Sequence, residues 1–428
     1  MTGFTQEGIV GGRFLCLSAF SGIGGLDLGL EHAGFSIIGG IENDSGARRS
    51  LALNRPKRKY LKPHDINRVA RNLLPRDLGI GEGELALLAA GPPCQPFSNA
   101  AQWSRTGALG LNDERAGSLQ SLLTLVERLL PHAVLIENVP GFVRGSRSAL
   151  PILDERIAAV NYRNGTRYKL VCKTLNAAEY GVPQRRKRAI IIAFRNGAVP
   201  DWPAATHLGN PVLSWDALHD VYPDALPIAS GRFAGLLPSV PEGQNYQFFT
   251  ERGEGPPLFG YRRRFWSFLL KLAKAEPAWT LPASPGPATG PFHWDSRPLA
   301  PEELLRLQTF PSSWRLEGTY REQVRQAGNA TPPLLAEVLG RSIRAQLSGK
   351  KIHGNPKLAI ARSEFVPPPT QARPVAAEYL ALSGRHDPHP GAGRGPKPRA
   401  QEAGTLMTDA GDFNSVVSAV SEASEFSA

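Results

Sequence analysis

The sequence predicts an α/β fold with a doubly wound sheet and a smaller, irregular second domain. In the first half of the chain, apolar runs of strand length alternate with longer segments of helical periodicity. Continuous apolar strands between helices are typical of a sheet that helices cover on both faces. From about residue 197 the alternation stops, and proline, glycine and aromatic residues dominate up to about residue 300.

The individual elements follow in order along the chain. Strands are predicted at residues 13–19, 35–41, 85–90, 133–137 and 188–194, and helices at 26–33, 45–53, 118–130, 301–308 and 332–347. We therefore expect an α/β domain at 1–196, an irregular domain at 197–300, and a return of helices to the first domain at 301–348. Residues 349–428 are rich in Pro, Ala, Gly and Ser without an apolar period, which predicts a disordered tail.

Composition restricts the classes of partner. The 428 residues carry a formal net charge of +11, which favours an anionic partner, and nucleic acid before anionic lipid. The three cysteines include no CxxC pair, which argues against a disulfide framework or a zinc site. No apolar run approaches the roughly 18 residues of a membrane span, and the N-terminus does not resemble a signal peptide. We expect a cytoplasmic protein without a membrane or metal partner.

The most informative stretch is Gly-Pro-Pro-Cys-Gln-Pro-Phe-Ser at residues 91–98. It follows the apolar strand at 85–90, and its prolines exclude a helix or an inner strand. Cys94 would therefore lie at the rim of the sheet, where open α/β sheets bind their ligands. A nucleophilic thiol and an inert buried cysteine both remain possible on this evidence alone.

Other polar residues also follow predicted strands. A turn with Ser21, Gly22, Gly24 and Gly25 comes after the first strand, although it is not the GxGxxG of a pyrophosphate site. Glu42 ends the second strand, where a carboxylate can accept both ribose hydroxyls. Glu137 ends the strand at 133–137, either as a solvated strand end or as a carboxylate on the same rim as Cys94. The basic run at 184–188 is either a solvated turn or a grip for a phosphate or a base oxygen.

Within the irregular domain, residues 259–266 interleave arginines with aromatic residues. Nucleic-acid surfaces often have this composition. The alternative is an amphipathic helix at 262–275, with Phe265, Phe268, Leu269 and Leu272 on its buried face and the arginines outward. Both interpretations stay open.

Taken together, these motifs resemble the DNA cytosine carbon-5 methyltransferases of bacterial restriction–modification systems. The resemblance covers about residues 13–345 and follows the family's order: residues 20–25, 42, 64–66, 91–98, 137–139, 184–188, 306–311 and 328–333. Ser18-Ala19 departs from the Asp-Leu of many members. The family's fold implies a mixed sheet of the S-adenosylmethionine-dependent, Rossmann-like type, with residues 1–196 as the catalytic and cofactor-binding domain and residues 197–300 as the target-recognition domain.

The resemblance assigns roles residue by residue. It implies that Cys94 attacks carbon 6 of the cytosine, that Glu137 protonates ring nitrogen 3, and that Arg186 and its supporting partner Arg188 hold the base. It implies S-adenosylmethionine as cofactor, bound by Phe20, Ser21, Gly22, Gly24, Gly25, Glu42, Asn43, Asp65, Ile66, Pro93, Leu119 and Asn329. It places Gln95, Ser98, Ser104 and Arg105 at the DNA, the last two within a loop (99–115) that closes over the base.

The expected function is therefore methyl transfer to carbon 5 of a flipped-out cytosine in a short double-stranded DNA sequence. We expect a monomer that acts at the nucleoid, with a cognate restriction endonuclease acting on the same site. Three alternatives compete with it: an RNA cytosine-5 methyltransferase, a catalytically silent DNA-binding protein, and a dinucleotide-dependent oxidoreductase. The recognition domain of roughly 100 residues favours DNA over RNA. The presence of Cys94 and Glu137 argues against a silent protein, and the missing glycine fingerprint argues against an oxidoreductase.

Overall fold

The computed structural model describes residues 12–93, 114–145, 148–261 and 266–383. Its core is a six-stranded mixed sheet in the order β2-β1-β3-β4-β7-β5. The strands are β1 (Phe14–Ala19), β2 (Phe35–Ile41), β3 (Leu87–Ala90), β4 (Ala133–Asn138), β5 (Val171–Asn176) and β7 (Lys187–Phe194). The predicted α/β fold class is confirmed, and the five predicted strands match observed ones within two residues at either end.

The direction of the strands brings their functional ends to one edge. β1 pairs in parallel with β2 and β3, and β3 pairs in parallel with β4, so these four strands end on the same side. β7 runs antiparallel to β4, with Asn138 opposite Ala189, so its first residues lie beside the end of β4. β2 lies on one side of β1, and β3, which follows it in the sequence, lies on the other side. A sheet of this topology binds ligands at such a switch point.

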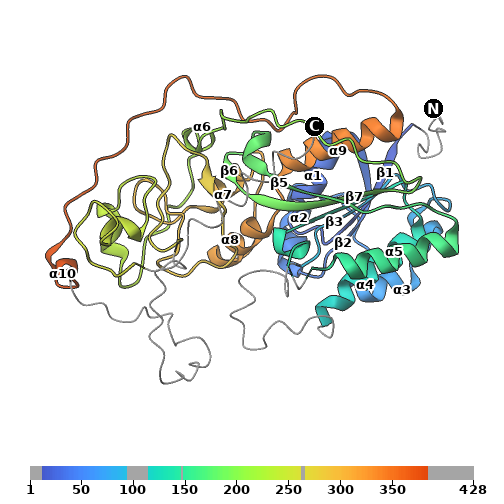
Figure 1. Cartoon of the computed structure of the whole chain (residues 1–428), viewed down its shortest axis with the longest axis horizontal. Coiled ribbons are helices and arrows are strands. Elements are labelled where there is room, and N and C mark those ends of the chain that lie inside the picture. Colours follow the sequence, from blue (N-terminus) through green and yellow to red (C-terminus); the bar gives the residue numbers. More distant parts are fainter. Residues whose placement is uncertain (1–11, 94–113, 146–147, 262–265, 384–428) are drawn as a thin grey trace, which may run out of the picture. The chain divides into compact units, whose positions relative to one another are not determined.

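Helices cover both faces of the sheet (Figure 1). One face is covered by α3 (Ile66–Asn72), α4 (Glu114–Leu129) and α5 (Leu150–Asn164), and the other by α1 (Gly25–His32) and α9 (Pro333–Ser348). Successive strand residues alternate between the two cores: Leu15 and Leu17 face the first, whereas Phe14 and Cys16 face the second. Because α9 packs against α1, the helices that follow the irregular region return to this core, as the sequence predicts.

Three further helices lie between this sheet and the irregular region. They are α2 (Ser45–Asn54), α7 (Pro301–Leu307) and α8 (Tyr320–Asn329). Residues from all three share a third apolar cluster with Trp294 and Trp314, both of which are buried. The helices predicted at 45–53 and 301–308 are confirmed, whereas α3, α5, α8 and the edge strand β5 are not anticipated by the sequence analysis.

Residues 197–300, hereafter the recognition segment after the role that the sequence analysis expects for them, contain little regular structure. They hold α6 (Ser214–Leu218), two short 3₁₀ helices (Ala234–Ser239 and Tyr246–Phe249) and β8 (Ala278–Trp279), which pairs with β6 (Gln184–Arg185). An aromatic cluster forms their core, with ring centroids of Phe233, Tyr246 and Phe259 within 6 Å of Phe268.

The helix expected at residues 262–275 is wrong for the described part, 266–275. The backbone there lacks the hydrogen bonds of a helix and bonds mainly to distant segments: Leu269 N donates to Ala288 O at 2.9 Å and Leu272 N donates to Phe292 O at 2.8 Å. The expected burial nevertheless holds, because Phe268, Leu269 and Leu272 are buried. The apolar pattern therefore predicts the burial of these side chains correctly but not the backbone conformation. Residues 262–265, with the arginines, lie outside the described residues.

The disorder expected from residue 349 onward is wrong up to residue 383. This stretch runs from the end of α9 along the recognition segment to α10 (Ala377–Leu380), as the orange-to-red trace in Figure 1 shows. Its composition lacks an apolar period, but its backbone is held by hydrogen bonds to other parts of the chain, such as that from Arg373 N to Pro238 O at 2.9 Å. Residues 384–428 lie outside the described residues.

Candidate active site

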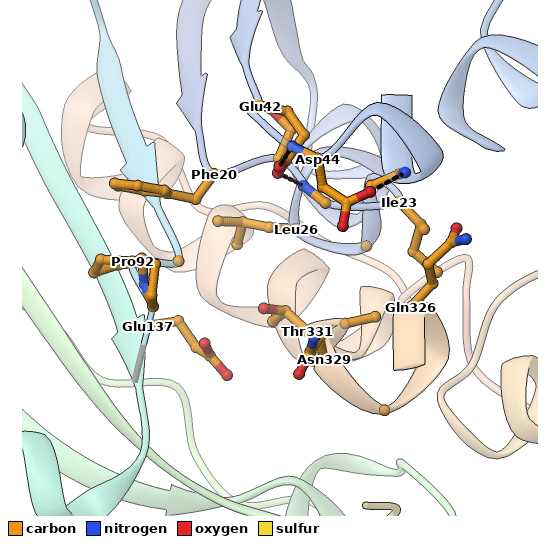
Figure 2. Close-up of a pocket in the computed structure, with 18 of the residues that line it drawn as sticks. Phe20, Ile23, Leu26, Glu42, Asp44, Pro92, Glu137, Gln326, Asn329 and Thr331 are labelled. Carbon is orange, nitrogen blue, oxygen red and sulfur yellow. Dashed lines mark hydrogen bonds between the residues drawn. The ribbon is translucent and has the colours of Figure 1, made fainter. Parts of the chain in front are cut away.

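A cavity of about 330 Å³ opens at the edge where the strands end. Its walls come from the ends of β1, β2, β3 and β4, the start of β7, and the link between α8 and α9. Figure 2 shows Phe20, Pro92 and Glu137 along one side, Glu42 and Asp44 along another, and Asn329 and Thr331 from the α8–α9 link. Segments far apart in the sequence thus meet around one site.

The turn after β1 is shaped by unusual backbone conformations. Phe20 has φ of 58° and Gly22 has φ of 53°, both in the left-handed region, where a residue with a bulky side chain such as Phe is rarely found. The Phe20 amide donates to Ile41 O at 2.7 Å, which ties the turn to the end of β2. The turn therefore presents the Phe20 ring and a bare Gly22 backbone to the cavity.

Glu42 fixes that turn from the other side. Its Oε2 accepts a hydrogen bond from Gly22 N at 2.7 Å, and its Oε1 accepts one from Asp44 N at 2.7 Å. Burial raises the pKa of Glu42, although these two hydrogen bonds act in the opposite direction. A carboxylate has about four acceptor positions, so two further hydroxyl donors can be accommodated.

The Gly91–Pro93 turn after β3 is attached to the neighbouring strands. Gly91 N donates to Ala19 O at 3.3 Å, and Asn138 Nδ2 donates to Pro92 O at 3.0 Å. These bonds fix the direction in which the chain leaves the sheet toward the next residue, Cys94. Cys94 itself, together with Gln95, Ser98, Ser104 and Arg105, lies outside the described residues.

Glu137 and two arginines form the polar floor of the cavity. Arg188 Nε lies 2.9 Å from Glu137 Oε1, and both side chains are about 10% exposed. Glu137 Oε2 faces Gly91, where an added Cβ would lie 3.9 Å from it. Arg186, which is 2% exposed, donates from Nη2 to Gly328 O at 3.1 Å and to Ala330 O at 2.9 Å. Arg186, which directly precedes β7, is thereby joined to the end of α8, where Asn329 lies, and to the link that follows it.

Most of the predicted site residues that the structure describes come together at this cavity. Those that line it are Phe20, Ser21, Gly22, Gly25, Glu42, Pro93, Glu137, Arg186, Arg188 and Asn329. Gly24, Asn43, Asp65, Ile66 and Leu119 are not among its lining residues. Gly24 is the N-cap residue that precedes α1, Asp65 caps α3 through a hydrogen bond from Asn67 N at 2.9 Å, and Ile66 and Leu119 are buried in the first core. Their roles toward a cofactor stay predictions.

The sequence analysis missed one pair at the rim. Arg325 Nη1 on α8 lies 2.6 Å from Asp44 Oδ2, and both residues line the cavity. Burial acts to raise the pKa of Asp44, but the hydrogen bond and charge of Arg325 together with backbone hydrogen bonds from Ala47 and Gly46 outweigh it, so the pKa is lowered. The start of α8 could have been predicted, because Thr319 and Glu322 have the spacing of a capping box, and the structure forms this capping box.

The arrangement suits a nucleoside. An aromatic ring, a bare glycine backbone and a buried carboxylate with spare acceptor capacity fit an adenine and its ribose, which supports the expected S-adenosylmethionine. Within the described residues no cluster of three or more His, Cys, Asp or Glu could hold a metal ion. None of the helices in that part of the chain is long and apolar enough to cross a membrane.

Comparison with known proteins gives a consistent result. A model of the C-5 cytosine-specific DNA methylases matches residues 14–218 and 283–345. The chain is 32% identical over 373 residues to the Type II methyltransferase M.SacI of Streptomyces achromogenes, covering 77% of this chain and 93% of the relative. It is 33% identical over 338 residues to M.Sau96I of Staphylococcus aureus, covering 76% and 74%.

The fold is shared with solved structures as well. The crystal structure of a mutant Spodoptera frugiperda DNMT2 superposes with a TM-score of 0.53 at 16% identity, covering 78% of this chain and 100% of that one. On the strength of the family match and the relatives, this chain belongs to the C-5 cytosine-specific DNA methylases, which are DNA (cytosine-5-)-methyltransferases that take their methyl group from S-adenosylmethionine.

Proposed function

We propose that this methyltransferase modifies a flipped-out cytosine within one short double-stranded DNA sequence, with Cys94 as nucleophile and Glu137 as general acid. The observation that carries the proposal is the position of Glu137. Its Oε1 is paired with Arg188, while its Oε2 faces Gly91, three residues before Cys94. A carboxyl group and a thiol would thus approach one base from neighbouring strand ends.

The proposed chemistry follows from the low nucleophilicity of carbon 5 of cytosine. Addition of the Cys94 thiolate to carbon 6, with a proton passing from Glu137 Oε2 to ring nitrogen 3, converts the ring into an enamine whose carbon 5 is electron-rich. S-adenosylmethionine supplies the methyl group that carbon 5 then takes up. Removal of the carbon 5 proton by a base, elimination of the Cys94 thiolate and return of the nitrogen 3 proton to Glu137 restore the aromatic ring and both side chains, and the methyl donor would depart as its neutral thioether.

The two arginines would position the base. Arg188 holds the Glu137 carboxylate in one orientation, and we assign Arg186 to the base near its oxygen 2. Arg186 is fixed by carbonyl groups of the α8–α9 link, which also carries Asn329, so the base and cofactor regions share one support. A cytosine stacked within a duplex cannot be approached at carbons 5 and 6 from above and below its ring, so the base must leave the helix.

Sequence selection is assigned to the recognition segment. The family model omits residues 219–282, which lie inside this segment, while matching the chain on both sides of it. An irregular surface of loops built on an aromatic core is suited to reading base edges in the major groove. Because the relatives bear the names of Type II methyltransferases, we propose that a restriction endonuclease acts on the same sequence. We further propose a monomer that works in the cytoplasm at the nucleoid.

A covalent trap tests the mechanism. Fluorine at carbon 5 cannot leave as a proton would, so a duplex with 5-fluorocytosine at the target should remain bonded to Cys94 in the presence of S-adenosylmethionine. We expect a complex that survives denaturing electrophoresis with the wild type and none with Cys94→Ala. A denaturation-resistant complex of equal yield with both proteins would contradict Cys94 as the nucleophile.

A further inference from the structure

We propose that residues 349–383, hereafter the strap, are a specificity element that fixes the recognition segment to the catalytic domain. The inference rests on the proposed function. The strap lies beyond the last residue matched by the family model, residue 345. Three groups of contacts, hereafter the anchors, follow one another along the strap. The first joins it to the catalytic domain, and the other two join it to the recognition segment.

The first anchor is a buried carboxylate on α9. Glu337 is fully buried, and its two oxygens accept hydrogen bonds from Lys357 N at 2.8 Å and Leu358 N at 2.9 Å. Arg341, one turn further along the helix, donates to Asn355 O at 3.0 Å and to His353 O at 2.9 Å. These contacts use backbone groups of the strap, so they hold its path regardless of its side chains.

The second anchor joins the strap to the start of the recognition segment. Ser363 N donates to Asp216 Oδ1 at 2.8 Å, and Arg362 Nη1 donates to Asn210 Oδ1 at 2.7 Å. Asp216 also accepts a hydrogen bond from Leu213 N at 2.8 Å, so the strap shares a carboxylate that organises α6.

The third anchor completes an ion pair inside the recognition segment. Lys274 pairs with Glu242, and the two side chains are 8% and 3% exposed. Thr370 joins both partners, because its amide donates to Glu242 Oε1 at 2.7 Å and its hydroxyl accepts from Lys274 Nζ at 2.9 Å. A shielded charge pair with additional hydrogen bonds holds a defined geometry more strictly than an exposed one.

The strap also supplies part of the hydrophobic core of the recognition segment. Tyr379 is 8% exposed and belongs to the same cluster as Phe249 and Phe268. Its hydroxyl donates to Arg232 O at 3.2 Å and lies so close to Gly235 that a Cβ there would be 2.8 Å away. Between the second and third anchors the chain contains Pro367, Pro368 and Pro369, which favour a stiff, extended backbone.

These contacts connect specificity to the reaction. The strap starts at the end of α9, the helix that follows the α8–α9 link at the cavity, and it ends inside the core of the recognition segment. Its stiffness fixes how far a recognised base pair lies from the cavity. Loosening the strap should therefore weaken discrimination between DNA sequences more than cofactor binding.

Cutting the strap within the full chain tests this directly. A site-specific protease sequence is inserted after Phe365, which is 68% exposed and lies between the second and third anchors. The uncut and cut proteins are compared by kcat/KM on the target duplex and on a duplex with one base pair changed outside the cytosine. We expect the ratio of the two values to fall at least tenfold on cutting, while the Kd for S-adenosylmethionine changes less than twofold.

A point variant tests the same proposal without inserting a protease site into the strap. Tyr379→Ala should lower the same ratio several-fold with cofactor binding intact, whereas Tyr162→Ala, at a residue 91% exposed on α5, should leave it unchanged. A ratio that stays within twofold after cutting overturns the proposal, as does loss of cofactor binding together with discrimination. An uncut protein that methylates no cytosine would instead overturn the proposed function.

Discussion

The cavity and the recognition segment achieve order in different ways. At the cavity, side chains project from strand ends whose positions follow from sheet register, as Glu137 and Arg188 do on the antiparallel pair β4–β7. In the recognition segment, position follows from an aromatic cluster and scattered backbone hydrogen bonds between distant segments. A sheet edge fixes a few reacting groups rigidly, which suits one chemistry. Irregular loops allow the contact surface to differ, which suits choice among sequences.

This contrast predicts that substitutions at the cavity alter turnover, whereas substitutions in the recognition segment alter which DNA is used. The largest expected effect is that of Cys94→Ala. Without the thiolate, carbon 5 is not activated, so turnover should fall by at least about 10⁴-fold. Gel-shift and calorimetric titrations should show that DNA and S-adenosylmethionine still bind. Measurable turnover near the wild-type rate would remove the covalent mechanism.

Glu137→Gln comes next. The amide keeps the size of the side chain but cannot pass a proton to ring nitrogen 3, so kcat should fall by about 10²–10⁴-fold, the usual contribution of a general acid. Single-turnover methylation at saturating DNA measures this directly. The preference among DNA sequences should not change. A variant that instead discriminates sequences poorly would place Glu137 on the recognition side of the comparison.

Phe268→Ala probes the other region. The ring is 9% exposed and lies at the centre of the aromatic cluster, so its removal should cost about 3–5 kcal/mol of stability. We expect KM for DNA to rise while the Kd for S-adenosylmethionine stays constant, because the cluster does not extend to the cavity. Phe365→Ala, at an exposed ring, is the matched control. Weakened cofactor binding in Phe268→Ala would show that the two regions are not separable.

The two regions should also titrate in different pH ranges. Asp27 lies on α1, just after the turn that follows β1, where it is 1% exposed and accepts a hydrogen bond from Ser18. Burial raises the pKa of Asp27 to about 6. The folded state therefore favours the protonated form. This contribution to stability is complete below about pH 4 and is lost as pH rises through 6, a loss of about 3 kcal/mol. Urea unfolding of Asp27→Asn, compared with the wild type from pH 4 to 7, should show this slope in the wild type alone.

In the recognition segment, Lys271 is the buried group whose titration should change stability, and it does so at alkaline pH, whereas Asp27 does so at acidic pH. It is 3% exposed, and burial lowers the pKa of Lys271 to about 8. The folded state favours the neutral amine, so its contribution to stability is complete above about pH 10.5 and is lost as pH falls through 8, again by about 3 kcal/mol. Lys271→Met should lack this slope between pH 8 and 10. Equal slopes in variant and wild type would mean that the amine is hydrated in the folded state.

The sequence predicts the catalytic half well because its signals are local. A run such as residues 85–90 is apolar throughout, which indicates a strand buried on both faces, and the residues that follow such strands must meet at one edge. Glu42 and Glu137 could be placed at the site by that rule, whereas Arg188 begins a strand and reaches the same edge because β7 runs antiparallel to β4. The edge strand β5 was missed because it is only partly buried and its exposed Lys173 interrupts the apolar pattern.

Elements held by distant contacts could not be predicted in this way. Arg325 reaches the cavity rim only because α8 packs beside α2 and meets Asp44. The strap has the composition of a disordered chain, yet the buried carboxylates Glu337 and Glu242 bind its backbone amides. Neither partnership leaves a periodic pattern in the sequence, because it depends on residues more than a hundred positions away or on the backbone itself.

Bisulfite sequencing of plasmid DNA from cells that express the full chain would reveal methylation of carbon 5 of cytosine within one short DNA sequence. We predict protected cytosines confined to a single short motif, and none in cells that express Cys94→Ala. Wholly unprotected plasmid DNA from cells that contain the folded wild-type protein would contradict the account.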